Sequence, residues 1–220
     1  MVGTVQTAFP DVMFWLHEYG DAFLLARMDN LSIDMKQWSS RISNTNIAGD
    51  LGRVGVKPPM EILGFLAWGP RDSDLFAKGA KICTDDNPYY EFSTPRVRYI
   101  PADVASLRMK LQLFGPLQPL PIKPDTIENR SLIAEMSLDR GNLARALVEF
   151  QRAWSLNPDN SGIGMKCAYI QWDLLYRGDD AIATLKTILK RNPGNAAAQK
   201  KLREVETGKR YSMEPGQASN

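Results

Sequence analysis

The chain of 220 residues is long enough for one large domain or two small ones, and its hydrophobic content of 44% suffices for a globular core. Its 27 basic residues nearly balance its 25 acidic residues, which excludes the strongly basic surface of a typical nucleic-acid binder. The longest apolar stretch, residues 62–68, falls far short of the ~20 residues that a membrane-spanning helix needs. We therefore expect a cytoplasmic protein that neither binds nucleic acid nor inserts into a membrane.

The residue types that usually ligate metals or act as nucleophiles are scattered along the chain. Cys83 and Cys167 lie far apart and have no further ligand at metal-binding spacing around them. The only histidine is His17, which excludes a His-rich metal site. We expect both cysteines to be reduced packing residues, and we expect the chain to bind no metal or cofactor.

Two short apolar runs open the chain. Residues 12–16 (VMFWL) and 22–26 (AFLLA) are too short for typical helices, and a polar turn that contains Gly20 separates them. This arrangement predicts an antiparallel hairpin.

Helices are expected after the hairpin. Ser32 can cap a helix because apolar residues follow it at three- and four-residue spacing. These residues are Met35, Trp38 and Ile42. Residues 44–55 are rich in Asn and Gly and are expected to form a loop. Pro59 then suits the first turn of a second helix, which is predicted to continue through residues 61–68.

The middle of the chain is rich in turn formers and proline. Asp72 can cap a short helix, and the sequence TDDNP at residues 84–88 predicts a turn before an aromatic strand at residues 89–92. Prolines at positions 116, 119, 121 and 124 favour an extended conformation and exclude helix. We interpret residues 114–125 as a spacer between two modules.

Beyond the spacer the sequence looks helical, and two segments repeat. Residues 141–158 read GNLARALVEFQRAWSLNP, and residues 178–193 read GDDAIATLKTILKRNP. Pro158 and Pro193 are 35 positions apart, which is about the length of one helix-turn-helix unit of a solenoid. Coincidental amphipathic helices are the alternative interpretation.

The first of these segments resembles the tetratricopeptide repeat. Small residues, Ala146 and Ala153, allow two helices to approach closely, and Phe150 fills the gap between them. The preceding helix departs from the pattern, because Arg130 and Ser137 stand where large apolar residues are usual. Residues 195–206 resemble the polar helix that caps such arrays. The resemblance implies that a partner binds the inward positions of the first helix. These positions are Glu128, Ser131, Glu135 and Leu138.

Residues 8–96 carry several short motifs in a characteristic order. They are AFPDVMFW at 8–15, DAFLLA at 21–26, ID at 33–34, DLGRVGV at 50–56 and TDDNPYYEFSTPR at 84–96. In these motifs the segment resembles the carboxy-terminal part of the polyamine aminopropyltransferases, the spermidine synthase family, especially bacterial forms fused to a transporter-like region. The resemblance implies that residues 12–26 are the last two strands of a methyltransferase-like sheet.

That family places its nucleotide-binding loop and catalytic aspartate on earlier strands, and this sequence contains no G-x-G-x-x-G motif. We therefore expect no catalytic residue. A site for substrate ammonium groups needs carboxylates. The candidates are Glu18, Asp21, Asp85 and Asp86. For the last two, an alternative role is to accept backbone hydrogen bonds within the turn.

The predicted fold is mainly α. A small α+β module at residues 1–113 and the spacer at 114–125 precede a tetratricopeptide-type solenoid at 126–208 and a disordered tail at 209–220. We expect a non-catalytic module that binds a protein or peptide through its helical repeats. The alternative is the distal part of an aminopropyltransferase, which completes a substrate pocket when the nucleotide-binding half is present. A third, structural hypothesis predicts that open strand edges cause self-association or pairing with an upstream transferase-like chain.

Overall fold

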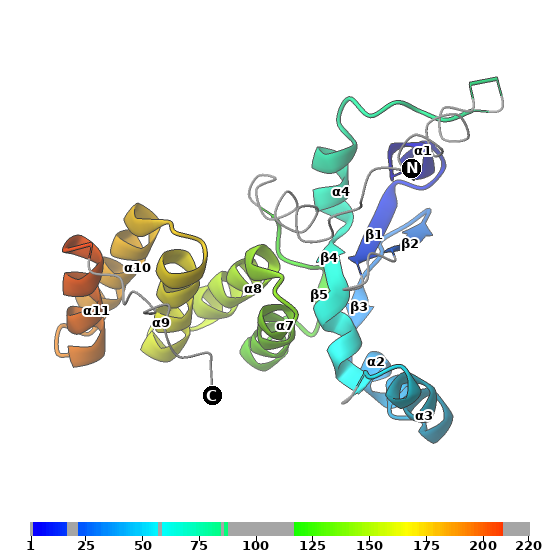
Figure 1. Cartoon of the computed structure of the whole chain (residues 1–220). Coiled ribbons are helices and arrows are strands. Elements are labelled where there is room, and N and C mark those ends of the chain that lie inside the picture. The colour runs from blue at the N-terminus through cyan, green and yellow to red at the C-terminus, as the bar shows by residue number, and fades with distance from the viewer. Residues whose placement is uncertain (1, 17–21, 57–58, 85, 88–116, 209–220) are drawn as a thin grey trace, which may run out of the picture. The chain divides into compact units, whose positions relative to one another are not determined.

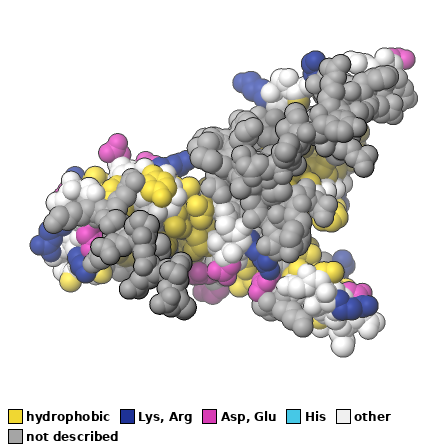
Figure 2. All heavy atoms as spheres, viewed as in Figure 1, with side chains coloured by type: hydrophobic (Ala, Val, Ile, Leu, Met, Phe, Trp, Pro, Cys, Tyr) yellow, Lys and Arg dark blue, Asp and Glu magenta, His cyan; other side chains and the backbone are white. Residues whose placement is uncertain are grey.

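The computed structural model is mainly helical with a small N-terminal sheet, as predicted (Figure 1). It describes residues 2–16, 22–56, 59–84, 86–87 and 117–208. The chain forms two compact units, Met1–Ala153 and Trp154–Asn220. Hydrophobic and charged side chains are interspersed on the face drawn in Figure 2. Among the described residues, none of the helices combines the length and the apolar character needed to cross a membrane.

The N-terminal sheet has three strands. β1 (Asp11–Leu16) and β2 (Ala22–Arg27) pair antiparallel in unbroken register, with Val12 opposite Ala26, which confirms the predicted hairpin. β4 (Leu66–Trp68) pairs with the other edge of β1, so the strand order is β2-β1-β4. The predicted helix over residues 61–68 is therefore wrong in its second half. Buried backbone groups need hydrogen-bond partners, and β1 supplies them to this fully buried segment.

Short helices surround the sheet. α1 (Val2–Ala8) lies near the start of the chain, and η1 (Pro59–Phe65) is a 3-10 helix that leads into β4. α4 (Pro70–Ala77) packs beside β1, where the hydroxyl of Ser73 donates a hydrogen bond to the carbonyl of Val12 at 2.9 Å.

Two further helices follow the hairpin. α2 (Met35–Ile42) forms as expected, but Asp34 caps it, because its carboxylate accepts backbone N–H bonds from Lys36 and Gln37 at 3.0 Å. The segment expected to be a loop contains α3 (Thr45–Arg53). Its N-cap is Asn44, whose side chain accepts the N–H of the residue two positions later. Asparagine here starts a helix, because it is among the residues most favoured at an N-cap.

The described part of the proline-rich segment is packed into the first unit, although its sequence indicates a spacer. Leu117, Leu120 and Ile122 are all buried. β5 (Ile122–Lys123) pairs in parallel with β3 (Ile33–Asp34). Apolar residues alternate with the prolines, so an extended chain can direct them to the core.

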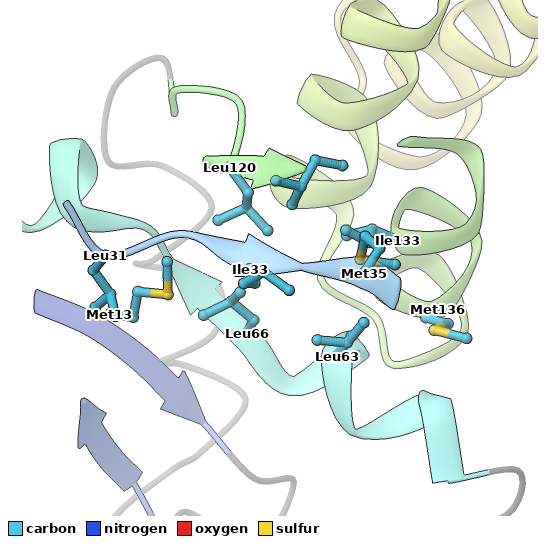
Figure 3. Packing of buried hydrophobic residues seen from close by; sticks show 10 residues of the cluster. Met13, Leu31, Ile33, Met35, Leu63, Leu66, Leu120, Ile133 and Met136 are labelled. Atoms are coloured by element: carbon cyan, nitrogen blue, oxygen red, sulfur yellow. The ribbon is translucent and has the colours of Figure 1, made fainter. Parts of the chain in front are cut away.

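The core of the first unit brings together residues from distant parts of the chain (Figure 3). Its buried members are Met13, Leu31, Ile33, Met35, Leu63, Leu66, Leu120, Ile122, Ile133 and Met136. The last two belong to α7 (Ile127–Asp139), which packs closely against η1. A Cβ atom on Gly64 would lie only 2.5 Å from the carbonyl oxygen of Met136, so glycine permits this close approach.

α7 and α8 (Leu143–Leu156) form a helical hairpin. The turn between them uses Gly141, whose φ of +70° favours glycine. On α8 the three positions expected to pack against the preceding helix are completely buried. They are Ala146, Phe150 and Ala153.

The described part of the second unit consists of helices. Its elements are α9 (Ser161–Tyr169), the π-helical η2 (Ile170–Leu174), α10 (Gly178–Arg191) and α11 (Ala196–Glu206). Its core contains Trp172, Leu185 and Ile188. α11 packs against α10 in the place predicted for a capping helix.

Candidate functional site

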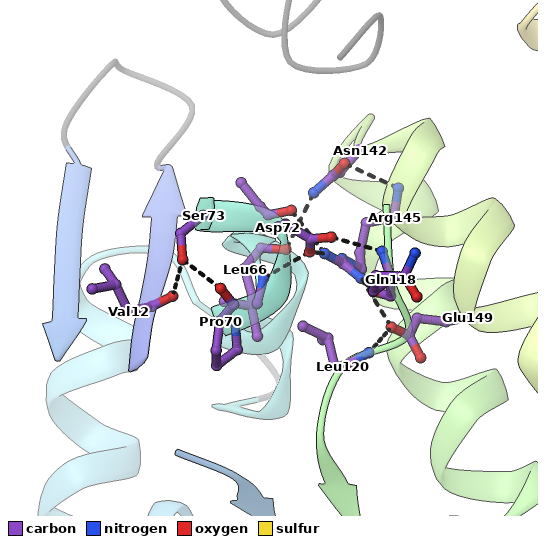
Figure 4. A network of polar contacts seen from close by, with 12 residues as sticks. Val12, Leu66, Pro70, Asp72, Ser73, Gln118, Leu120, Asn142, Arg145 and Glu149 are labelled. Carbon is purple, nitrogen blue, oxygen red and sulfur yellow. Dashed lines mark hydrogen bonds and ion pairs between the residues drawn. The ribbon is translucent and has the colours of Figure 1, made fainter. Parts of the chain in front are cut away.

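Charged side chains from α4, α7 and α8 meet inside the first unit. Figure 4 shows the contacts of Asp72, Arg145 and Glu149. Asp72, Arg130, Arg145 and Glu149 are each at most 4% exposed. Charged residues are rarely buried this deeply unless they are paired. We call these four residues the buried ion network.

Arg145 lies at the centre of the network. Its guanidinium donates to the carboxylate of Asp72 and, at 3.2 Å, to Oε1 of Glu149, one turn further along α8. It also donates to the backbone carbonyl of Gln118 at 2.6 Å and to that of Ala67 at 3.2 Å. One side chain therefore links α8 to both α4 and the proline-rich segment.

Glu149 and Arg130 hold the proline-rich segment at Leu120. The carboxylate of Glu149 accepts the N–H of Leu120 at 2.8 Å, and Arg130 donates to the carbonyl of the same residue at 2.8 Å. The two side chains also pair with each other at 2.5 Å. The residue that breaks the repeat pattern in α7 thus has a defined partner in α8.

Asp72 completes the arrangement from α4. Its carboxylate accepts the N–H of Gly69 at 2.9 Å, which caps α4, and the N–H of Gln118 at 2.6 Å. Because prolines donate no N–H, the N–H groups of Gln118 and Leu120 are among the few in this segment that need acceptors. The network supplies acceptors for both.

Asp125 lies at the more exposed margin of the network. It pairs with Nε of Arg130 at 2.7 Å and with Arg152 at 2.6 Å. Partial burial alone would raise the pKa of this carboxyl, but hydrogen bonds and charges from the two arginines outweigh burial and lower the pKa below its usual value. Asp125 is therefore ionised throughout the neutral range.

The buried ion network is suited to holding the fold together. Its carboxylates are all engaged by arginine or backbone donors, and arginine does not give up its proton in proteins. A pocket of about 730 Å³ with both polar and apolar walls lies beside it, and its lining includes Asp72, Asp125 and Arg130, which are paired as described. The positive charges of the arginines and the negative charges of the carboxylates neutralise one another.

Sequence reasoning did not find this network. It identified Arg130 only as a departure from the repeat pattern and Asp72 only as a helix cap. A signal was present in α8, where Arg145 and Glu149 flank the apolar stripe of Ala146 and Phe150 with a spacing of one helical turn.

The predicted partner-binding residues share one face of α7. Glu128 is exposed, and the other three, Ser131, Glu135 and Leu138, are partly buried. Their spacing of three, four and three residues puts them on one side of the helix. This face differs from the one that carries Arg130.

Most of the predicted substrate carboxylates fall outside the described residues. This applies to Glu18, Asp21 and Asp85. Asp86 is exposed in a turn where the backbones of Thr84 and Asn87 bond to each other. A polyamine site on these four residues therefore stays a prediction.

No metal centre is formed by the described residues, in which no three His, Cys, Asp or Glu side chains gather. Cys83 is half-buried and Cys167 is fully buried, and both are free thiols. Burial raises the pKa of Cys167 to about 12, so this thiol is neutral and packs as an apolar group.

Comparison with known proteins bears on the helical region. Residues 137–205 match the tetratricopeptide repeat family, which supports the repeats predicted from the sequence. No curated protein matches the chain. Nothing in these comparisons supports the resemblance of residues 8–96 to the aminopropyltransferases, which stays a prediction. Residues 137–205, from the end of α7 to α11, are accordingly a tetratricopeptide-type repeat array.

Proposed function

We propose that this chain is a protein-interaction module whose helical repeats bind a segment of a partner protein. The match of residues 137–205 to the tetratricopeptide repeat is the observation that supports this most directly. Stacked helical repeats expose extended faces, and proteins built from them use these faces for binding.

We place the contact on the face of α7 that carries Glu128, Ser131, Glu135 and Leu138. Acidic side chains gather over this helix (Figure 2). Glu128 is exposed in the first turn, and the partly buried Leu138 near the other end offers an apolar surface. The partner segment should therefore present a basic side chain to Glu128 and an apolar side chain to Leu138.

The buried ion network supports this function by fixing α7. Arg130 ties the far side of the helix to Glu149 and to Leu120, and Thr126 caps its start by accepting the N–H of Asn129 at 3.3 Å. A binding face on a rigid helix loses little conformational entropy when a partner binds.

The test uses the full chain as bait for a displayed library of random twelve-residue peptides. We expect enrichment of peptides that combine basic and apolar residues. An enriched peptide should bind Glu128→Lys at least about tenfold more weakly than the wild-type chain in calorimetry, because the substitution opposes like charges.

Asp179→Lys is the matched control, because Asp179 is also an acidic residue in the first turn of a repeat helix. It should leave the affinity unchanged. If no peptide is enriched, or if Glu128→Lys binds the enriched peptides as tightly as the wild type, the proposed contact face is wrong.

A further inference from the structure

The outer edge of β2 has no strand beside it among the described residues. β2 is the end member of the order β2-β1-β4, and all six of its residues pair with β1 on the other edge. Within the part of the chain that the structure describes, the outer edge therefore presents a regular row of backbone N–H and C=O groups. Such a row is a template for the addition of another strand.

The sequence of β2 is typical of a strand with neighbours on both sides. Residues 22–26 (AFLLA) contain no charge and no proline, and no bulge interrupts their pairing with β1. Natural proteins usually protect an exposed strand edge with a charged residue, a proline or a bulge, and these five residues have none of them. Phe23 is nevertheless 66% exposed and Leu25 48% exposed. Apolar residues on both faces are characteristic of strands whose two faces are both covered.

We propose that the outer edge of β2 pairs with the β2 strand of a second copy of this chain, antiparallel and centred on Leu24. In this register Phe23 of one copy lies opposite Leu25 of the other, and Ala22 lies opposite Ala26. Both large side chains stand on the same face of the sheet, because they are two residues apart. An aromatic side chain next to an aliphatic one is a favourable cross-strand pair.

The charges of β2 are compatible with this pairing. The five paired residues carry none, so no like charges are opposed and none is buried. Arg27 follows them and is paired with Asp29 at 3.0 Å in a solvent-exposed position. In the antiparallel register the two Arg27 side chains lie at opposite ends of the paired strands.

A second copy is the occupant that the sequence of β2 fits, because AFLLA reads similarly in both directions about its centre. A two-fold axis through Leu24 makes the contact the same for both chains, so assembly ends at a dimer. The two three-stranded sheets then form one sheet in which neither β2 strand is at an edge.

The exposed apolar surface also extends beyond the strand edge. Phe23 lines an apolar pocket of about 470 Å³, together with Trp15, Trp38 and Val54. A side chain of the second copy placed against Phe23 therefore extends a contact surface that is already apolar.

Sedimentation of the full chain over a range of concentrations tests the dimer. We expect a reversible monomer–dimer equilibrium. Leu25→Lys should raise its Kd at least about tenfold, because it replaces both apolar Phe23–Leu25 cross-strand pairs and adds a charge to each copy. Met28→Lys is the matched control, because Met28 is 68% exposed and lies just after the strand, and it should leave the Kd unchanged. Circular dichroism establishes that each variant is folded.

Cysteine crosslinking tests the register independently of any effect on folding. In a Cys83→Ser background, Leu24→Cys should form a covalent dimer on mild oxidation, since directly opposed residues have Cβ atoms about 4.5–5.5 Å apart. Ala22→Cys alone should not crosslink, but its mixture with Ala26→Cys should.

A chain that stays monomeric at every concentration would overturn the proposal, since it would mean that the edge is covered in some other way. A dimer that Leu25→Lys leaves intact would equally overturn it. If the chain forms a dimer but Leu24→Cys gives no covalent dimer on oxidation, the register centred on Leu24 is refuted.

Discussion

Arg145 in α8 donates a hydrogen bond to the carboxylate of Asp72 in α4, a residue 73 positions earlier in the chain. Their side chains are 0% and 2% exposed. The first repeat helices and the upstream sheet module are thus joined through a charged interior contact, and they should unfold together.

Replacement of Arg145 by methionine should lower the free energy of unfolding of the first unit by roughly 3–5 kcal/mol, because Asp72 then keeps a buried charge without its cationic partner. Urea denaturation followed by circular dichroism measures the change. Arg53→Ala removes an exposed arginine that pairs with Asp50, and it should cost less than about 1 kcal/mol. If the free energy of unfolding falls equally in the two variants, the buried ion pair contributes no more to stability than an exposed one.

Asp125 should make the stability depend on pH in the acidic range. Its pKa is lowered in the folded chain, so its contribution is present above the ordinary carboxyl pKa and is lost as the pH falls through the lowered value. Asp125→Asn should therefore be less stable than the wild type at pH 7, by on the order of 1 kcal/mol for this partly exposed group. The difference should vanish in strong acid. Denaturation curves for both proteins at a series of pH values provide the measurement, and a pH-independent difference would contradict the prediction.

Gly64 and Gly49 offer a pair of glycine-to-alanine substitutions with opposite expected outcomes. At Gly64 a Cβ atom meets the backbone of Met136 at 2.5 Å, so Gly64→Ala should destabilise the chain by roughly 1–3 kcal/mol through overpacking. At Gly49, inside α3, nothing beyond the adjacent residues and the backbone of the helix itself lies within 4 Å of the added Cβ. Gly49→Ala should stabilise the chain by up to about 1 kcal/mol. Thermal unfolding of the two variants measures the difference. If Gly64→Ala and Gly49→Ala unfold at similar temperatures, the close contact between η1 and α7 is refuted.

The two cysteines should differ in reactivity. Cys167 is completely buried with a pKa raised to about 12, so at pH 8 its thiol is both protonated and inaccessible. Cys83 is half-buried and should react with a chromogenic disulfide reagent much sooner. We expect one thiol per chain to react in the native protein and two in urea. Rapid reaction of both thiols without denaturant would show that the core of the second unit opens readily.

Local patterns in the sequence were sufficient to predict the hairpin and the repeats. The strands of the hairpin are adjacent in sequence and separated by a polar turn, and the repeat helices have a period of 35 residues. The small residues Ala146 and Ala153 and the large Phe150 identified the packing face of α8, and all three are completely buried.

Features that depend on distant partners could not be predicted. Residues 66–68 are an apolar run that suits a helix as well as a strand, and only the open edge of β1 decides between them. The burial of Arg130 requires Glu149 on another helix and the backbone of Leu120. Arg130 departs from the repeat pattern, but nothing near it in the sequence identifies these partners, and only the folded chain brings them together.

The buried ion network is hydrogen-bonded to the backbone of Gln118 and Leu120, and this affects where the chain can be divided for expression. A fragment that begins at the first residue of α7 would keep the repeat helices but lose the chain that covers Arg130 and Glu149. It would also expose Ile133 and Met136 to water. Helical arrays need a polar outer surface on their terminal repeat. The sheet module therefore serves as the N-terminal cap of the first repeat, and fragments that omit it should aggregate.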